Sequence, residues 1–304
     1  MSSKEKRSVP PEAIELYNQF IHGEITRRDF ISGANKLAVA GLTAGAIVTA
    51  LMPNYADAQQ VSKTDERIRA SYITIPSPQG NGYVKGYFVR PFSADSRTEA
   101  PVKLPGIVVV HENRGLNPHT EDVARRLALA NFNVFAPDVL TSVGGYPGDD
   151  YQGGQLFAKI DNAKKFEDIV ASALWLKARP DSTGKIGATG FCYGGGVSNQ
   201  LAVRLGADLG AAVPFYGAAP EAADVAKIKA AILVQHGELD TRLVQAWPAY
   251  EKALKAANVP YQGNIFKGAV HGFFNDATPE RYDAVAAGEA WNSMVGWFNK
   301  YLRG

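Results

Sequence analysis

The chain has 304 residues, of which 46% are hydrophobic and 20% are charged, and its formal net charge at pH 7 is +2. This length is sufficient for one sizeable core, so a second folded domain is not required. The small net charge, and the lack of a basic run interleaved with aromatic residues, argue against a nucleic-acid partner. The single cysteine excludes an intramolecular disulfide and a cysteine-rich zinc site, and the five histidines form no H-E-x-x-H motif.

The first 58 residues have the features of an export leader. Thr26-Arg27-Arg28-Asp29-Phe30-Ile31 precedes an apolar run over residues 37–52, and Ala56-Asp57-Ala58 follows. The run is short and rich in alanine and glycine for a spanning helix, and the small-x-small triplet suits signal peptidase. The pattern predicts a twin-arginine (Tat) signal peptide over residues 1–58, cleaved after Ala58, with the Tat machinery as partner and a periplasmic destination. An uncleaved membrane anchor and a core helix of the folded protein are the alternatives.

After a short linker at residues 59–69, strand and helix patterns alternate. The first two strands flank a turn rich in proline and glycine, which predicts an antiparallel hairpin at a sheet edge. The later alternation predicts a mostly parallel sheet covered by helices, an α/β fold. We expect strands at 70–75, 84–90, 106–111, 134–137, 185–189, 211–215, 231–235 and 261–266, and helices at 120–130, 164–178, 195–205, 244–257 and 281–301. The longest irregular stretch, 140–154, is expected to overhang a pocket.

Cys192 lies at the centre of Gly190-Phe191-Cys192-Tyr193-Gly194, between a predicted strand and a predicted helix. This spacing predicts a nucleophile elbow, a sharp turn that presents its central residue at the top of a sheet. The glycines allow close backbone crossing, and the following helix directs N–H groups toward the reacting carbonyl. We interpret the thiol as a nucleophile that a nearby base must activate, rather than as a buried structural cysteine.

Partners for this thiol are expected at the carboxyl ends of the other parallel strands, where open α/β sheets bind their ligands. Two predicted strands are followed by Asp240 and His271, respectively. The chain order of nucleophile, acid and base is that of α/β-hydrolases, with His271 as base and Asp240 as its orienting acid. His236 and Glu238 are the rival base and acid in the same loop as Asp240.

The strand at 106–111 leads into Glu112, Asn113 and Arg114. Hydrolases of this fold take one oxyanion-hole N–H from this loop and one from the residue after the nucleophile, which assigns the donors to Asn113 and Tyr193. Two charged side chains at the mouth of a buried strand are either used in the site or paired with each other at the surface.

From about residue 70 to the C-terminus, the chain resembles the dienelactone hydrolase family, and its leader resembles that of an exported branch. The resemblance implies an α/β-hydrolase fold over residues 70–304, a Cys192–His271–Asp240 triad and no cofactor. It also implies that Glu112 helps to deprotonate a thiol that is neutral at rest. The residues that carry it are His111-Glu112-Asn113-Arg114-Gly115, Gly190-Phe191-Cys192-Tyr193-Gly194-Gly195, Gly237-Glu238-Leu239-Asp240 and His271-Gly272-Phe273.

One departure from the family bears on the substrate. An arginine that holds the substrate carboxylate in the archetypal enzymes is replaced here by Asn275, and residues 146–155 also lack an arginine. A neutral or less acidic ester or lactone is therefore expected. The predicted substrate-binding residues are the nearest cation and four aromatic walls typical of small-ligand pockets, namely Arg114, Tyr146, Tyr151, Phe273 and Phe274.

The sequence thus predicts a carboxymethylenebutenolidase-type hydrolase of small esters or lactones, acting through a thioacyl intermediate on Cys192 without metal or organic cofactor. A non-catalytic binding protein that retains the fold is one alternative. A thiol redox protein is another, although the chain has no second cysteine that could resolve an oxidised thiol.

Overall fold

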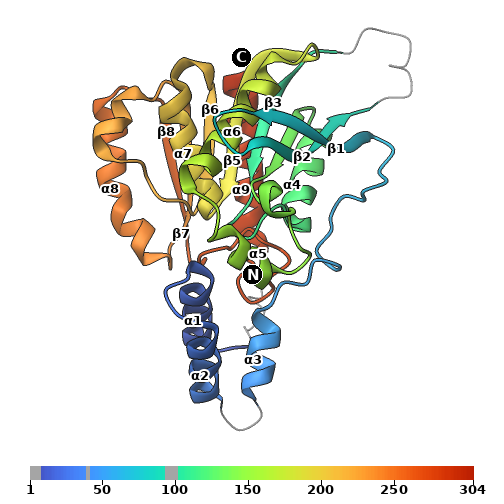
Figure 1. Cartoon of the computed structure of the whole chain (residues 1–304). Helices are drawn as coiled ribbons and strands as arrows, with labels where there is room; N and C mark the ends of the chain where they lie inside the picture. The colour runs from blue at the N-terminus through green and yellow to red at the C-terminus, as the bar shows by residue number, and fades with distance from the viewer. Residues whose placement is uncertain (1–7, 39–41, 93–101) are drawn as a thin grey trace.

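The computed structural model describes residues 8–38, 42–92 and 102–304. Residues 1–7 and 39–41, which belong to the predicted leader, lie outside the described part. A mixed sheet with helices on both faces forms the body of the molecule, and three N-terminal helices project from one end of it (Figure 1). The body begins at residue 68, close to the boundary expected from the sequence.

The described strands form one eight-stranded sheet in the order β1-β2-β4-β3-β5-β6-β7-β8. The β1–β2 hairpin is antiparallel, β2 is also antiparallel to β4, and all other neighbours are parallel. This confirms the α/β-hydrolase fold with an antiparallel hairpin at the sheet edge. The strands are β1 (Ile68–Ser77), β2 (Gly82–Pro91), β3 (Leu104–Val110), β4 (Asn133–Asp138), β5 (Ser182–Phe191), β6 (Ala211–Phe215), β7 (Ala231–Gly237) and β8 (Tyr261–Phe266).

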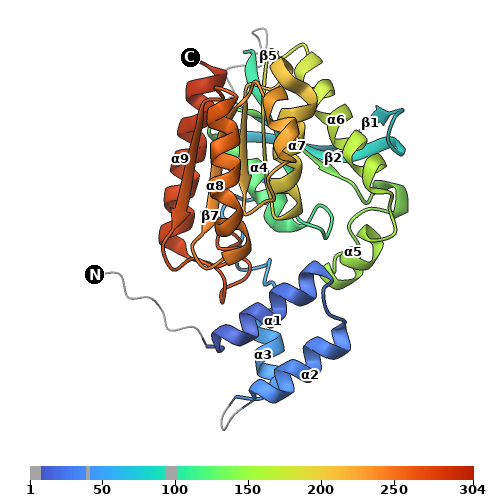
Figure 2. The same cartoon turned by 90° about the vertical axis from the view of Figure 1, so that its left-hand side faces the viewer.

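Two hydrophobic cores lie on opposite faces of this sheet. The first contains side chains from α4 (Pro118–Leu129) and α9 (Ala284–Leu302). The second contains side chains from α6 (Asn162–Ala178), α7 (Tyr193–Leu205) and α8 (Thr241–Ala256), which Figure 2 shows on the other face. Residues 105–110 of β3 and all of β4 are buried, because both faces of the central strands are covered. Short 3-10 helices occupy Thr141–Val143, Gly206–Asp208 and Ala222–Lys227.

The prediction of an irregular stretch at residues 140–154 is wrong at the C-terminal end of that range, because α5 (Asp150–Phe157) begins inside it. The Asp149 side chain accepts a hydrogen bond from the Gln152 backbone N–H and caps this helix. The sequence did not predict this helix because it contains Gly153 and Gly154, and glycine is a poor helix former. A Cβ at Gly153 would overlap the carbonyl oxygen of Arg114, so close packing explains the glycine.

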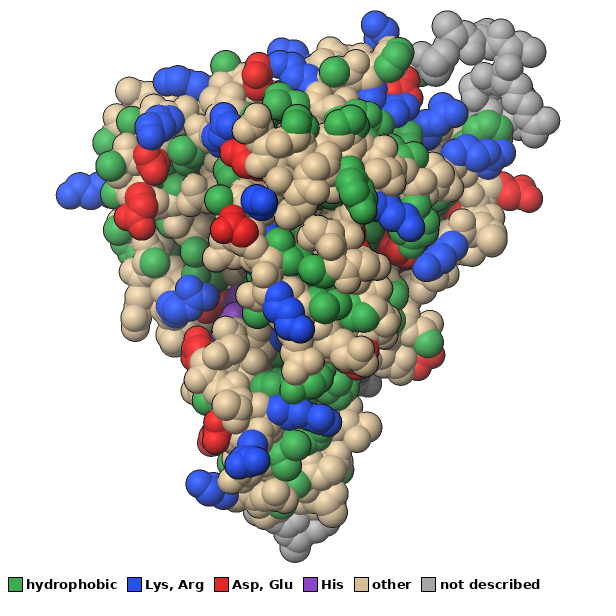
Figure 3. All heavy atoms as spheres, in the orientation of Figure 1, with side chains coloured by type: hydrophobic (Ala, Val, Ile, Leu, Met, Phe, Trp, Pro, Cys, Tyr) green, Lys and Arg blue, Asp and Glu red, His purple; other side chains and the backbone are tan. Residues whose placement is uncertain are grey.

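The N-terminal helices α1 (Pro11–His22), α2 (Arg27–Leu37) and α3 (Ala44–Leu51) enclose a small core of their own, to which the α/β domain contributes Val270. Thr26 and Asp29 form a capping box that starts α2. The projection carries Lys and Arg side chains on its surface (Figure 3), and the predicted signal arginines, Arg27 and Arg28, are exposed. No helix in the described ranges is both long and apolar enough to cross a membrane. Export and cleavage after Ala58 stay predictions.

Candidate active site

Cys192 occupies the sharp turn between β5 and α7, with backbone angles φ 55° and ψ −110°. A positive φ is costly for a residue with a side chain, and such strain concentrates at functional sites. The neighbouring glycines make the turn possible. A Cβ at Gly190 or Gly194 would overlap backbone atoms that include the Val110 carbonyl, and one at Gly195 would overlap that of Phe215. The sequence motif therefore folds as the predicted elbow.

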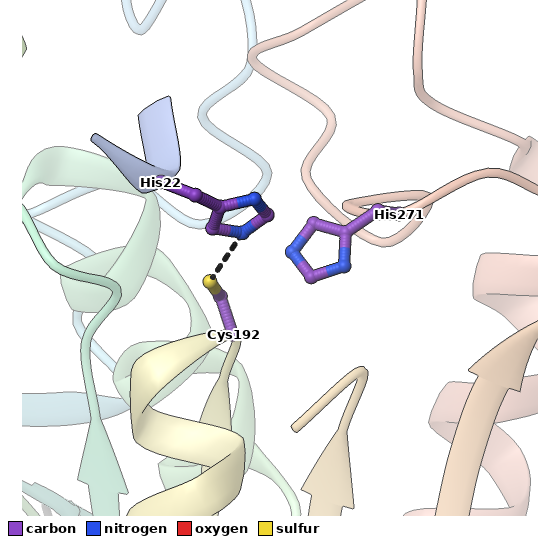
Figure 4. A group of neighbouring side chains, drawn as sticks. All are labelled: His22, Cys192 and His271. Carbon is purple, nitrogen blue, oxygen red and sulfur yellow. Dashed lines mark hydrogen bonds between the residues drawn. The ribbon is translucent and has the colours of Figure 1, made fainter. Parts of the chain in front are cut away.

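His271 and Asp240 are joined by a short hydrogen bond, in which Nδ1–H of the histidine donates to Oδ2 of the carboxylate at 2.5 Å. Both side chains are buried. Nε2 of His271 is the nitrogen left over, and it lies within 4.8 Å of the Cys192 Sγ (Figure 4). The Asp240 carboxylate thus fixes the His271 tautomer that has its proton on Nδ1. The unprotonated Nε2 then faces the Cys192 thiol.

A third side chain, His22, reaches Cys192 from the N-terminal helices. It is the last residue of α1, which ends at Gly23 in the left-handed conformation. Its Nε2 is hydrogen-bonded to the Cys192 Sγ at 3.4 Å, and Figure 4 shows both histidines directed toward the sulfur. The sequence reasoning missed His22, because it assigned the whole segment to a removable leader. The apolar spacing of residues 11–22 and the capping box at Thr26 were the available signals for folded helices.

Thiol and base perturb each other's ionisation. Burial raises the pKa of Cys192, but the charge of His271 and the hydrogen bond from His22 outweigh it and lower the pKa to about 6. Burial lowers the pKa of His271, but the thiolate charge and the Asp240 hydrogen bond raise it to about 10. A thiolate–imidazolium pair is therefore favoured at neutral pH. This differs from the neutral resting thiol that the family resemblance implied.

His236 and Glu238, the rival base and acid of the sequence analysis, have other roles. His236 is buried at the end of β7, and burial lowers its pKa to about 4, so it stays neutral at neutral pH. The Glu238 carboxylate accepts a hydrogen bond from the Gly268 backbone N–H at 2.8 Å and stabilises a turn. The hydrogen bond to His271 is made by Asp240 instead.

The predicted oxyanion loop lies beside the end of α1. The Ile21 carbonyl accepts hydrogen bonds from Asn113 Nδ2 at 2.8 Å and from Arg114 Nη2 at 2.9 Å. Tyr193 is the first residue of α7, so its backbone N–H has no acceptor within the helix. Glu112 is buried, and within the described ranges no hydrogen bond joins its carboxylate to Cys192.

A cavity of about 320 Å³ opens beside Cys192. Its walls come from His22, from the start of α7 and from the loop after β6, with Arg242 as the cationic side chain among its lining residues. The sequence reasoning missed Arg242, because its position next to Asp240 carries no pattern that distinguishes it from an ordinary helix residue. Arg114 does not line this cavity.

The four predicted aromatic walls also lie elsewhere. Phe273 and Phe274 are buried in the first hydrophobic core, among other aromatic rings. Tyr146 donates a hydrogen bond to Asp150, and Tyr151 stacks on Phe20 of α1. The loop expected to overhang a pocket therefore contacts the N-terminal helices. The sequence alone did not reveal that the N-terminal helices cover this loop.

Known proteins match most of the chain. A model described as the dienelactone hydrolase family matches residues 92–302, and one described as YqhI-like matches residues 1–40. The "Putative carboxymethylenebutenolidase" of Escherichia coli O157:H7 is 29% identical over 256 residues, covering 79% of this chain and 90% of that protein. The "Putative hydrolase fragment YghX" of Escherichia coli K12 is 53% identical over 120 residues, covering 40% of this chain and 97% of the fragment.

Solved structures give the same picture. The "Putative Dienelactone Hydrolase" from Klebsiella pneumoniae has a TM-score of 0.66 and 27% identity, and the match covers 77% of this chain and 99% of that one. The dienelactone hydrolase-like promiscuous phosphotriesterase P91 from metagenomic libraries has a TM-score of 0.64, 27% identity and the same coverages. Both proteins are thus matched almost completely, while about a quarter of this chain has no counterpart in them.

Proposed function

Because the chain belongs to the dienelactone hydrolase family and is a hydrolase of carboxylic esters or lactones, we propose that it cleaves its substrate with a Cys192–His271–Asp240 triad. The observation that carries this proposal is the His271–Asp240 hydrogen bond, with the second histidine nitrogen facing a cysteine held in a strained elbow. Each member comes from the carboxyl end of a different parallel strand, as the chemistry of this fold requires.

The proposed reaction has two half-reactions. The Cys192 thiolate attacks the carbonyl carbon, and the backbone N–H groups of Asn113 and Tyr193 stabilise the oxyanion. Collapse of the tetrahedral intermediate breaks the ester C–O bond, and the His271 imidazolium protonates the leaving oxygen. Water, deprotonated by His271, then attacks the thioester and releases the carboxylic acid and the thiolate. Asp240 holds the imidazole tautomer throughout.

The proposed substrate is a small neutral or weakly acidic ester or lactone. A cavity of about 320 Å³ accommodates a small molecule. Arg242 offers one cation to a carboxylate, whereas Arg114 is directed at the Ile21 carbonyl. A panel of matched neutral and acidic lactones, assayed with the wild type and with Arg242→Ala, separates the two classes. Unchanged kcat/KM for the acidic lactones in the variant would exclude Arg242 as their anchor.

The decisive experiment is Cys192→Ala assayed on p-nitrophenyl acetate and simple lactones. Loss of a triad nucleophile costs on the order of 10⁴ or more in kcat. A phosphotriester belongs in the panel, because the P91 relative carries that activity in its name. Wild-type turnover of the esters by Cys192→Ala would refute the nucleophile assignment, and inactivity of the wild type on the whole panel would favour a binding protein.

We also propose that, at a pH below about 6, where the Cys192 thiol is neutral, Glu112 assists its ionisation when substrate arrives. Its carboxylate is buried in the loop that supplies the proposed Asn113 donor. At a pH below the Cys192 pKa of about 6, we expect Glu112→Gln to slow alkylation of Cys192 by iodoacetamide in the presence of a slow substrate. An alkylation rate equal to that of the wild type would reject this role.

Finally, we propose that residues 1–58 direct export through the Tat machinery. The support is the sequence motif and the exposure of Arg27 and Arg28, which leaves the pair accessible to a receptor. Mass spectrometry of the protein recovered from its native host should find an N-terminus at residue 59. Recovery of the fully exported protein with an intact Met1 would contradict cleavage.

A further inference from the structure

Three side chains with metal-ligating atoms meet where α1 ends over the nucleophile. The ligand atoms of His22, Cys192 and His271 all lie within 4.8 Å of one another (Figure 4). The two imidazole rings meet edge to face, with their centroids 4.8 Å apart. Ester hydrolysis by a triad needs only one of these histidines, so the second calls for an explanation.

We propose that these three side chains form a binding site for one zinc ion, and that the bound ion blocks the active site. Zinc binds thiolate sulfur at about 2.3 Å and imidazole nitrogen at about 2.0–2.1 Å in tetrahedral geometry, which separates neighbouring ligand atoms by roughly 3.3–3.6 Å. The 3.4 Å between Cys192 Sγ and His22 Nε2 falls within this range, and the separations among the three atoms reach up to 4.8 Å, so side-chain rotation must bring the widest pair closer. A thiolate with two imidazoles is a ligand set that zinc accepts, and the adjoining cavity leaves the fourth position open.

The arrangement of His271 also suits a zinc ligand. Its Nε2 is buried, and a hydrogen bond with Cys192 contributes to its raised pKa. Its Nδ1 is held by Asp240. A histidine that donates one N–H to a carboxylate and leaves its other nitrogen free has the arrangement of histidine ligands in zinc proteins.

The structure also holds His22 in place for this role. The end of α1 is fixed to the α/β domain because the Ile21 carbonyl accepts hydrogen bonds from Asn113 and Arg114. The N-terminal segment is further attached through the Tyr55 hydroxyl, which donates to Asp150 at 2.8 Å. A ligand pre-positioned in this way loses little conformational freedom when the ion binds.

The consequence for activity rests on the proposed triad. The ion would occupy the electron pairs of the Cys192 thiolate and of His271 Nε2, so the bound enzyme would be unable to attack a carbonyl. Binding to a protonated thiol would release its proton. Because His22 lies in the predicted leader, cleavage after Ala58 would remove one ligand and weaken the site. The intact chain would therefore be the zinc-sensitive form.

The test is a metal titration of the purified, chelator-treated full chain under reducing conditions. Co²⁺ serves as the spectroscopic probe, followed by competition with Zn²⁺. We expect tetrahedral d–d bands and a thiolate-to-cobalt charge-transfer band. His22→Gln should weaken binding by more than about 100-fold, beyond the 10–100-fold typical of losing a group that only orients a metal ligand. His22→Cys, which restores a ligand, should recover most of the affinity, and His236→Gln is the matched control that should keep it.

Several outcomes would overturn the inference. Absence of a charge-transfer band, or equal affinity in the wild type and His22→Gln, would exclude a three-ligand site. Circular dichroism of each variant identifies loss of folding, and recovery in His22→Cys separates ligation from a structural role. The titration is also independent of the proposed triad. Tight Co²⁺ binding by a chain whose turnover survives Cys192→Ala would refute the triad alone, whereas Cys192-dependent turnover without metal binding would refute only the zinc site.

Discussion

The α/β domain and the N-terminal helices contact Cys192, the proposed nucleophile, in different ways. The domain fixes Cys192 with continuous backbone, a strand and a helix joined by an elbow in which glycines are obligatory. The helices reach the same atom through one side chain, His22, at the end of a segment with its own small core. Solved relatives match about as much of the chain as the domain alone contains. We therefore expect the domain to carry the chemistry and the helices to modify access to it.

The largest expected effect lies in the domain. Asp240→Asn should lower kcat by about 10²–10⁴, because the amide no longer fixes the tautomer that leaves His271 Nε2 free to act as base. Steady-state kinetics on an activated ester measures the change. His236→Gln, at the end of the strand that precedes Asp240, is the matched control and should leave kcat within a few-fold. A larger loss in the control than in Asp240→Asn would reverse the assignment of the two residues.

The elbow gives a matched pair for stability. Gly194→Ala should destabilise the fold by about 3 kcal/mol, the upper end of overpacking costs, because its Cβ would overlap the backbone of Val110. Gly196→Ala meets only Ala218 at 3.6 Å or more and should stabilise α7 by about 0.5–1 kcal/mol. Urea denaturation monitored by circular dichroism measures both. Equal midpoints for the two variants would show that the elbow tolerates a side chain.

Removing the N-terminal helices tests access to the thiol. Deletion of residues 1–58 should leave a folded domain, since the match to the dienelactone hydrolase family lies at residues 92–302 and the sheet begins at residue 68. We expect iodoacetamide to modify Cys192 several-fold faster in the truncated form when both proteins are assayed at a pH where the thiol is ionised. Equal alkylation rates would mean that the helices do not restrict access.

The smallest expected effect is on ionisation. The Cys192 thiolate should form as the pH rises through about 6, and the His271 imidazolium should be lost as it rises through about 10. His22→Ala removes a hydrogen bond to the thiolate, so the pKa of Cys192 should rise by about one unit, the size of a hydrogen bond to a charged group. Thiolate absorbance in the ultraviolet measures the shift, and the acid limb of kcat/KM should move to higher pH with it. A pKa that stays constant or falls would contradict the contribution of His22.

The positions of the strands and of the elbow could be predicted from the sequence for local reasons. Buried parallel strands are continuous apolar runs, and Gly190 and Gly194 mark a turn that a Cβ would block. The positions of Asp240 and His271 followed from the rule that ligands bind at the carboxyl ends of parallel strands. The substrate pocket was not accessible in the same way. The sequence predicted Phe273 and Phe274 as walls of the pocket, but both side chains are buried in the first hydrophobic core.

The sequence by itself determined the fold and the residues of the proposed triad, because both depend on local patterns and on the order of elements along the chain. Only the tertiary structure decided that His22 lies 3.4 Å from the Cys192 sulfur. That contact joins residues 170 positions apart. It depends on how α1 docks against Asn113 and Arg114, and no local pattern encodes such a long-range contact. The same tertiary contact turns a predicted leader into part of the candidate active site.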